Sequence, residues 1–402
     1  MDKIETFDVV VVGGGPAGAT AADDLARQGW RVMLLDRDGR IKPCGGAIPP
    51  RLIKDFLIPD ELLVARARSA RMVSPKDARV DIPIENGFVG MVDREQFDEF
   101  LRERARENGA VRRCGSFTRM ERDDQGTVIH FQSRDRHTRG EGTPTMVRAR
   151  AVIGADGARS EVARQSGLGE SKYVFAYHEI VRAPGHGAEP APAGYDGTRC
   201  DVIYNGDISP DFYGWVFPHG DTMSIGTGSA DKGFSLRSAT ARLRQSAGLA
   251  GCETLRREGA PIPMKPLKRW DNGKDVVLAG DAAGVVAPAS GEGIYYAMAG
   301  GRMAADSVQK MLQTGNVRAL AGARKQFMKE HGTVFFVLGI MQRFWYVNDK
   351  RRERFVSICK DKDVQQMTFD SYMNKVLTRK KPMAQVRIFF KDMAHLLGLA
   401  RV

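Results

Sequence analysis

The stretch Val9-Val10-Val11-Val12-Gly13-Gly14-Gly15-Pro16-Ala17-Gly18 decides the fold of this chain. Four consecutive β-branched residues predict a strand that is buried on both faces. The glycines that follow allow a tight turn and a close approach of the backbone to a diphosphate. Residues 19–28 have helical composition and stop before Gly29, a residue type suited to the position after a helix. The order of strand, glycine-rich turn and helix is typical of a dinucleotide-binding fold.

An acidic residue completes this pattern. A second predicted strand, 31–35, ends at Asp36, eighteen residues after Gly18. That distance and residue type are expected of the carboxylate that accepts a hydrogen bond from an adenosine ribose hydroxyl. A glycine motif alone is a weak signal, and the alternative is a glycine-rich turn without a ligand. The surrounding strands, helix and acid favour the nucleotide site.

Composition is typical of a globular enzyme. The chain has 402 residues, 42% of them hydrophobic, which is enough for two or three packed units. The five cysteines are odd in number and lack CxxC spacing, so we expect neither a disulfide framework nor a zinc site. The seven histidines show no ligand spacing, and we expect no metal. The net charge of +12 is concentrated after residue 342 without a recognition motif, which argues against nucleic-acid binding.

Later segments extend the nucleotide-binding unit. Residues after Asp93 are predicted to form a helix that ends at Asn108-Gly109. Two further predicted strands, 149–153 and 276–279, run into turns that contain glycine and aspartate. Ligands sit beyond the carboxyl ends of strands in an open parallel sheet, so these turns are expected near the nucleotide. Residues 170–268 alternate polar and apolar types, as a half-buried antiparallel sheet does.

Three further strings carry a resemblance to a known family: Lys42-Pro43-Cys44-Gly45-Gly46-Ala47, Pro210-Asp211-Phe212-Tyr213-Gly214-Trp215-Val216-Phe217-Pro218, and Pro288-Ala289-Ser290-Gly291-Glu292-Gly293-Ile294. With the earlier glycine turns, the chain resembles single-Rossmann FAD enzymes of the aromatic-hydroxylase type over roughly residues 5–340. Within that group it is similar to the geranylgeranyl reductase branch. The resemblance implies reduction of a geranylgeranyl group to a phytyl tail in three steps, in chlorophyll or bacteriochlorophyll biosynthesis, with FAD as cofactor and NADPH as electron donor.

The implied fold is an α/β protein with one Rossmann-type FAD-binding domain, an inserted antiparallel β-sheet substrate domain and a helical C-terminal region. The expected segments are FAD-binding residues 1–65, 91–169 and 269–315, substrate-sheet residues 66–90 and 170–268, and a helical, basic region 316–402.

The resemblance also implies the flavin-binding residues. Asp281 is expected to meet the ribityl chain, although it could instead cap a helix. Arg94 is expected to contact the diphosphate or ribityl chain, although it could be a solvated surface residue. A helix is expected to begin near Gly293-Ile294, where its positive end would favour the reduced flavin anion. The full expected set is Gly13, Gly15, Ala17, Gly18, Asp36, Cys44, Gly45, Gly46, Ala47, Arg94, Asp156, Gly157, Asp281, Gly293 and Ile294, with Asp156 and Gly157 in the turn associated with NADPH.

One strand is expected to form the substrate wall. Alternation places Tyr213, Trp215 and Phe217 on one face of a strand, and Phe212 and Val216 on the other. Three aromatic rings on one face would bury a prenyl chain, although aromatic residues also fill ordinary cores.

Protonation of the alkene needs an acid, and Cys44, Tyr213 or a water molecule are the candidates. The alternative for Cys44 is a small buried residue without catalytic function.

The C-terminal region suggests a membrane-bound substrate. Residues 334–346 are almost wholly apolar but too short to span a bilayer. Residues 386–400 place apolar side chains at helical spacing beside basic residues, which is typical of a helix bound to anionic lipid. We therefore expect a cytoplasmic protein attached peripherally to the inner or photosynthetic membrane, acting on a prenylated pigment or geranylgeranyl diphosphate. The alternative is a helix packed on the catalytic body.

Two other functions share these motifs. An aromatic hydroxylase of the same fold would consume oxygen with NADPH and substrate, and the string from Pro210 to Pro218 argues against it. A non-catalytic prenyl-pigment carrier would bind pigment without oxidising reduced flavin, and the intact FAD turns argue against that function.

Overall fold

The computed structural model describes residues 4–37, 41–85, 87–134, 142–185, 194–369 and 372–373. The chain divides into two units. Unit 1 contains Met1–Lys42, Arg94–Tyr173 and Pro261–Phe335, and unit 2 contains Pro43–Asp93, Val174–Ala260 and Phe336–Val402. The six segments expected from the sequence remain a prediction.

Unit 1 is built on a sheet whose central strand is the valine run. Its strands are β1 (Glu5–Val12), β2 (Val32–Asp36), β8 (Val111–Asp123), β9 (Gly126–Ser133), β10 (Thr143–Gly154) and β16 (Val276–Leu278). β1 pairs in parallel with β2 and β10, β2 pairs in parallel with β8, and β10 with β16. β9 pairs antiparallel with β8 and β10. Val9 to Val12 are at most 2% exposed, so the predicted doubly buried strand is confirmed.

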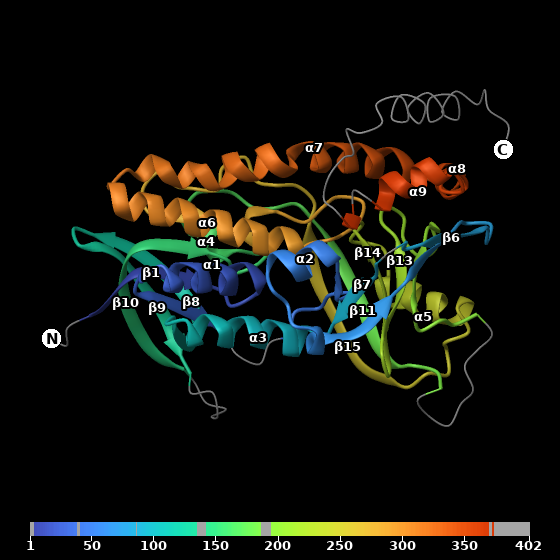
Figure 1. Cartoon of the computed structure of the whole chain (residues 1–402), viewed down its shortest axis with the longest axis horizontal. Coiled ribbons are helices and arrows are strands. Elements are labelled where there is room, and N and C mark those ends of the chain that lie inside the picture. Colours follow the sequence, from blue (N-terminus) through green and yellow to red (C-terminus); the bar gives the residue numbers. More distant parts are fainter. Residues whose placement is uncertain are drawn as a thin grey trace. The chain divides into compact units, whose positions relative to one another are not determined.

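Helices cover this sheet. They are α1 (Pro16–Arg27), α3 (Arg94–Glu107), α4 (Glu161–Gln165), α6 (Ile294–Thr314), the short 3-10 helices η2 (Gly280–Ala283) and η3 (Val317–Ala321), and the first part of α7 (Gly322–Trp345). α1 begins at Pro16, earlier than expected, because proline is suited to the first helical position. α1 and α6 lie side by side (Figure 1), and a Cβ on Gly301 would lie 2.2 Å from the Ala17 carbonyl oxygen.

Unit 2 contains the predicted antiparallel sheet. Its seven strands run in the order β15 (Thr254–Pro263), β11 (Tyr173–Arg182), β14 (Thr222–Ser229), β13 (Gly214–His219), β12 (Arg199–Ile203), β5 (Ser69–Val73) and β6 (Arg79–Pro83). The β12–β5 pair is parallel, whereas β11–β14, β14–β13, β13–β12 and β5–β6 are antiparallel. One face packs on α5 (Leu236–Ser246) through a core that includes Val216, Ile225 and Leu243.

The rest of unit 2 is a small sheet with short helices. The sheet has the order β3 (Ala47–Ile48), β7 (Val89–Val92), β4 (Leu63–Ala67), and the helices are α2 (Pro50–Asp55), η1 (Asp60–Leu62), α8 (Asp349–Ile358) and α9 (Lys362–Phe369). Within the described part of the chain, no helix combines the length and apolar character needed to cross a membrane. The amphipathic helix expected over 386–400 lies outside the described residues.

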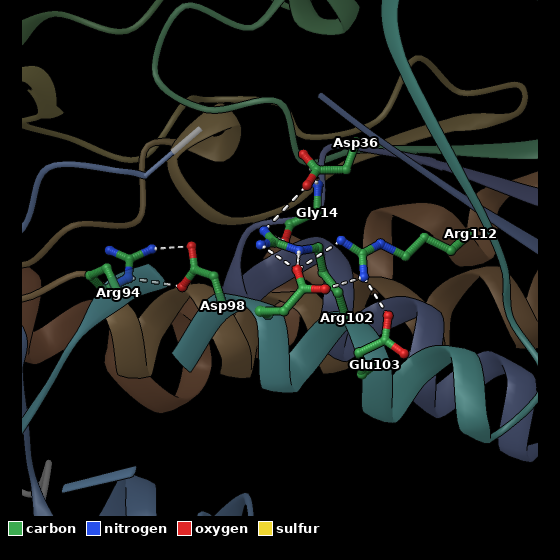
Figure 2. A network of polar contacts seen from close by, with 8 residues as sticks. Gly14, Asp36, Arg94, Asp98, Arg102, Glu103 and Arg112 are labelled. Atoms are coloured by element: carbon green, nitrogen blue, oxygen red, sulfur yellow. Dashed lines mark hydrogen bonds and ion pairs between the residues drawn. The ribbon is translucent and has the colours of Figure 1, made fainter. Parts of the chain in front are cut away.

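An ion-pair network fastens α3 to β8 (Figure 2). Arg112 of β8 is 4% exposed, and its guanidinium lies 2.6 Å from Glu99 Oε1 and 2.5 Å from Glu103 Oε1, both on α3. Arg102 adds a second contact to Glu99, at 2.8 Å. The hydrogen bond from Arg112, followed by that from Arg102, lowers the pKa of Glu99 from 4.5 to about 2, against the opposing effect of burial. The network joins the helix to the edge of the parallel strands.

The lowered pKa of Glu99 predicts how stability changes with pH. Because the folded chain keeps Glu99 ionised at pH values at which the unfolded chain takes up a proton, its contribution is present above pH 4.5. The contribution disappears as the pH falls towards 2. The advantage in unfolding free energy of the wild type over Glu99→Gln should therefore be largest near neutral pH and shrink below pH 4.5. Denaturant unfolding of both proteins at a series of pH values measures this difference in unfolding free energy.

Glu107→Gln is the matched control, since Glu107 lies on the same helix and makes no ion pair among the described residues. Its unfolding free energy should follow that of the wild type at every pH. If the wild type exceeds Glu99→Gln in unfolding free energy by the same amount from pH 7 to pH 3, the result would contradict the role given to this network.

Candidate functional site

The glycine-rich turn after β1 forms a cradle with one open side. Gly13 has a φ of +106°, and a Cβ there would lie 2.3 Å from the Ala155 carbonyl oxygen. A Cβ on Gly18 would lie 1.9 Å from the Gly13 oxygen. Backbone packing therefore requires both glycines. Gly15 differs, because a Cβ there would meet no atom within 4 Å.

The first turn of α1 faces this open side. Gly15 is the cap residue, no side chain caps the helix, and the first turn contains no acidic residue. The first backbone N–H groups of the helix therefore keep their capacity to bind an anion, and the helix dipole favours negative charge there. These features fit the diphosphate of FAD, with Gly15 as the position where the backbone approaches it.

Asp36 lies at the end of β2, as expected for a ribose-binding carboxylate. Its Oδ1 accepts a hydrogen bond of 3.4 Å from the Gly14 N–H. Its Oδ2 lies 3.2 Å from Nη1 of Arg102, which also donates to the Gly14 carbonyl oxygen at 3.3 Å (Figure 2). Arg102 thus orients the carboxylate against the glycine turn. Sequence reasoning missed Arg102, because nothing in the pattern of α3 distinguishes it from its neighbouring arginines.

Arg94 begins α3 and is 5% exposed, which excludes the alternative of a solvated surface residue. Its guanidinium forms two hydrogen bonds with Asp98, of 2.9 and 2.7 Å (Figure 2). A buried pair of this kind holds the guanidinium in one orientation. The contact of Arg94 with the cofactor remains a prediction.

Asp281 pairs with a lysine that the sequence did not single out. It lies in η2, directly after β16, and is 7% exposed. Lys42 Nζ lies 2.5 Å from its Oδ2. Its side chain does not cap η2, whose cap residue is Ala279, so the expected alternative of a helix cap is not observed there. The Lys42–Asp281 pair joins residues 239 positions apart, a distance over which a single sequence carries no pairing signal.

The helix α6 begins at Ile294 with Gly293 as its cap residue, which confirms the predicted start. No side chain caps it, and its first turn has no acidic residue. A Cβ on Gly293 would lie 3.9 Å from Asp281 Oδ1, so the positive end of α6 and this carboxylate are neighbours. This pairing of a hydrogen-bond acceptor with the positive end of a helix fits a polyhydroxyl chain followed by a ring that carries negative charge.

The Asp156 carboxylate is held by hydrogen bonds at the start of α4. Its Oδ1 accepts a hydrogen bond of 2.5 Å from Ser160, and its Oδ2 accepts from the Glu161 and Val162 N–H groups at 2.7 and 3.1 Å. The carboxylate therefore fixes the start of α4. Burial raises its pKa, and these hydrogen bonds oppose the effect. Gly157 follows with a φ of +91° and open space around it. The part of this turn in NADPH exchange remains a prediction.

The aromatic residues of unit 2 form a continuous strip. The ring centroids of Tyr213 and Trp215 are 6.1 Å apart, and those of Trp215 and Phe217 are 6.4 Å apart. We call these three residues the aromatic wall. Val216 faces the α5 core on the other side, as alternation predicted. The prediction for Phe212 was wrong: β13 begins only at Gly214, and Phe212 stacks on Tyr213 with centroids 4.2 Å apart.

The loop around Cys44 lies against the aromatic wall. A Cβ on Gly45 would lie 2.9 Å from the Phe217 ring. Gly46 has a φ of +69°, and a Cβ there would lie 2.6 Å from His219 Nε2. The Gly46 N–H donates to the Cys44 sulfur at 3.4 Å, and Cys44 is partly exposed. Two motifs far apart in the sequence therefore meet within unit 2, and only glycine fits at the contact.

Comparison with known proteins identifies the family of this chain. The family model of the pyridine nucleotide-disulphide oxidoreductases matches residues 7–216. The geranylgeranyl diphosphate reductase of Rhodobacter capsulatus is 60% identical over 98% of both chains. The reductase of the same name from Synechocystis is 37% identical over 97% of both chains.

Solved structures agree on the fold. A geranylgeranyl bacteriochlorophyll reductase-like protein from Thermoplasma acidophilum has a TM-score of 0.80 at 20% identity and covers 95% of this chain and 100% of its own. A flavin-dependent brominase has a TM-score of 0.74 at 16% identity and covers 96% of this chain and 99% of its own. The predicted fold class is confirmed. On the strength of the sequence matches, the chain belongs to the geranylgeranyl diphosphate reductase family.

Proposed function

We propose that this protein is an FAD-dependent reductase that saturates the double bonds of a geranylgeranyl group. Three successive reductions would give a phytyl tail for chlorophyll or bacteriochlorophyll, with NADPH as electron donor. The 60% identity to the Rhodobacter capsulatus reductase over 98% of both chains carries the proposal.

Unit 1 provides residues suited to hold FAD. The N-terminal turn of α1 and Gly15 would bind the diphosphate, and Asp36 would accept from the adenosine ribose. Asp281, oriented by Lys42, would accept from the ribityl chain. The uncapped start of α6 would stabilise negative charge on the flavin ring. Bound FAD in its reduced form supplies the hydride.

Unit 2 provides the substrate contacts in this proposal. The aromatic wall of Tyr213, Trp215 and Phe217 would bury the prenyl chain, whose binding free energy comes from removing CH₂ groups from water at about 0.8 kcal/mol each. Cys44 or Tyr213 would donate the proton that accompanies the hydride. Burial lowers the pKa of His219 to about 4, so the imidazole beside the Cys44 loop is neutral at pH 7. The loop therefore has no added positive charge from His219.

Anaerobic reoxidation of the flavin tests the proposal. The purified holoprotein is reduced, then mixed in detergent with geranylgeranyl diphosphate or geranylgeranyl-bacteriochlorophyll. We expect flavin absorbance to return with at least one acceptor, and mass spectrometry to show a tail that gains two hydrogens per step. The accepted compound identifies the preferred substrate.

A flavin that stays reduced with both acceptors would contradict the proposal. Rapid reoxidation by oxygen, dependent on an aromatic substrate, would then favour the hydroxylase. Tight binding of the prenylated pigment without any reoxidation would favour the carrier.

We also propose that the protein attaches peripherally to an anionic membrane, at the cytoplasmic face of the inner or photosynthetic membrane. The second part of α7 supports this, because Phe336 is 68% exposed and Ile340, one turn later, is 52% exposed. Val347 is 57% exposed, and Arg343 and Lys350 beside it are exposed cations. Exposed apolar side chains flanked by basic residues are typical of binding to anionic lipid.

Sedimentation with lipid vesicles tests this attachment. The double variant Phe336→Ser/Ile340→Ser should bind vesicles that contain phosphatidylglycerol about tenfold more weakly than the wild type, since it loses two apolar anchors. Val317→Ser, which alters an apolar side chain that is 40% exposed in unit 1, should bind like the wild type. Equal binding by the double variant and the wild type would contradict the assignment of this face.

A further inference from the structure

A row of three residues crosses the sheet of unit 2 and includes Trp215 of the aromatic wall. Trp215 of β13 and His178 of β11 are both paired with Gly226 of β14. A Cβ on Gly226 would lie 2.5 Å from Trp215 Cζ2 and 2.5 Å from His178 Cβ. The missing side chain therefore gives the indole and the imidazole room to extend over β14 on one face of the sheet.

On that face the two rings are joined by hydrogen bonds through Ser224. Trp215 Nε1 donates to Ser224 Oγ at 3.0 Å, and Ser224 Oγ lies 2.8 Å from His178 Nδ1. His178 Nε2 lies 3.0 Å from Glu258 Oε2 on β15. Ser224 is fully buried, His178 is 3% exposed and Trp215 is 6% exposed. We call Trp215, Ser224, His178 and Glu258 the indole chain.

The chemistry of these groups fixes the direction of the bond at each end of the indole chain. The indole N–H can only donate, so the Ser224 oxygen accepts from it. The direction of the hydrogen bond between Ser224 Oγ and His178 Nδ1 depends on the tautomer of the imidazole. The ionised Glu258 carboxylate can only accept, so His178 carries a hydrogen on Nε2 and donates it to Glu258. Arg256 Nε lies 2.5 Å from the other oxygen of Glu258. Burial acts to raise the pKa of Glu258, but the contacts with His178 and Arg256 outweigh it and keep the pKa lowered.

The order of acid, imidazole and hydroxyl resembles that of a hydrolase triad, but the indole chain cannot supply a nucleophile. Ser224 has no exposed surface, and its oxygen already accepts from the indole. Trp215 is the end of the indole chain that belongs to the aromatic wall. The arrangement therefore acts on the orientation of the indole.

We propose that Ser224, His178 and Glu258 are positioning residues that lock the Trp215 indole and so set the register of the prenyl chain. The inference rests on the proposed function. A locked indole keeps its N–H directed at Ser224 and presents an apolar surface to the hydrocarbon. A half-turn of the ring would move Nε1 away from Ser224 and leave a polar N–H to be satisfied elsewhere, which is unfavourable in a buried site. The indole chain therefore determines which double bond of the prenyl chain is presented for reduction.

The first test measures the indole itself in the FAD-bound protein. Exchange of the Trp215 Nε1 hydrogen with solvent is followed by NMR after ¹⁵N labelling of tryptophan, with Trp215→Phe to assign the signal. Ser224→Ala should accelerate exchange at least about fivefold, the order of one lost net hydrogen bond, and Ser224→Thr, which keeps the hydroxyl, should restore protection. Unchanged exchange in Ser224→Ala would overturn the proposal.

Ser229→Ala is the matched control, because Ser229 is also buried on the same strand and donates no hydrogen bond to the indole chain; its Oγ accepts from the Asp231 N–H. Its exchange should equal that of the wild type. Glu258→Gln, at the far end of the indole chain, should also accelerate exchange, but by less than Ser224→Ala. It provides a second variant should Ser224→Ala fold poorly.

The second test measures the products. Ser224→Ala should accumulate partly reduced tails and raise KM for the prenyl acceptor about fivefold, with kcat for the first reduction within about twofold of the wild type. Ser229→Ala should give the wild-type products. The same product distribution and KM in Ser224→Ala as in the wild type, or equal changes in both serine variants, would overturn the positioning role alone. A wild-type protein that reduces no prenyl acceptor would overturn the proposed function and the positioning role together, whatever the exchange result.

Discussion

The close backbone packing around Gly13 is the constraint on which the nucleotide-binding half of the molecule depends. Gly13 touches the turn after β10, Gly18 touches Gly13, and Gly301 of α6 touches Ala17 of α1, each at a distance that excludes a side chain. These contacts bring the starts of α1 and α6 to the carboxyl ends of the parallel strands. That packing sets where the positive ends of both helices lie. It also sets where the carboxylates of Asp36 and Asp281 lie.

The charged residues around this cradle are held in pairs. Asp36 is oriented by Arg102, Asp281 by Lys42, and Arg94 by Asp98. Ion pairs with little exposure contribute little net stability, because desolvation offsets their attraction. Their effect here is geometric, since each pair removes rotamers from a side chain that would contact a ligand. The indole chain of unit 2 applies the same principle to an aromatic side chain, with hydrogen bonds that end on one carboxylate.

Local patterns in the sequence predicted the features that depend on neighbouring residues. The valine run, the acid at the end of β2 and the start of α6 at Ile294 all depend on residues close in the chain, and each was predicted. The pairing of Lys42 with Asp281 joins segments 239 residues apart, and no periodic pattern predicts it. The error at Phe212 arose because alternation was applied before the strand began at Gly214. The resemblance identified the aromatic wall, but the serine and histidine bonded in a row beside Trp215 carry no sequence signal of their own.

The binding of FAD to the variant Gly15→Ala tests the central account most directly. Gly15 has a φ of −72°, which alanine adopts without strain, and a Cβ there meets no protein atom within 4 Å. The account predicts that the FAD-free variant unfolds at the same denaturant concentration as the FAD-free wild type but binds FAD at least about tenfold more weakly, because the methyl group occupies the space of the diphosphate. Wild-type affinity for FAD in this variant would show that the diphosphate lies elsewhere and would contradict the account.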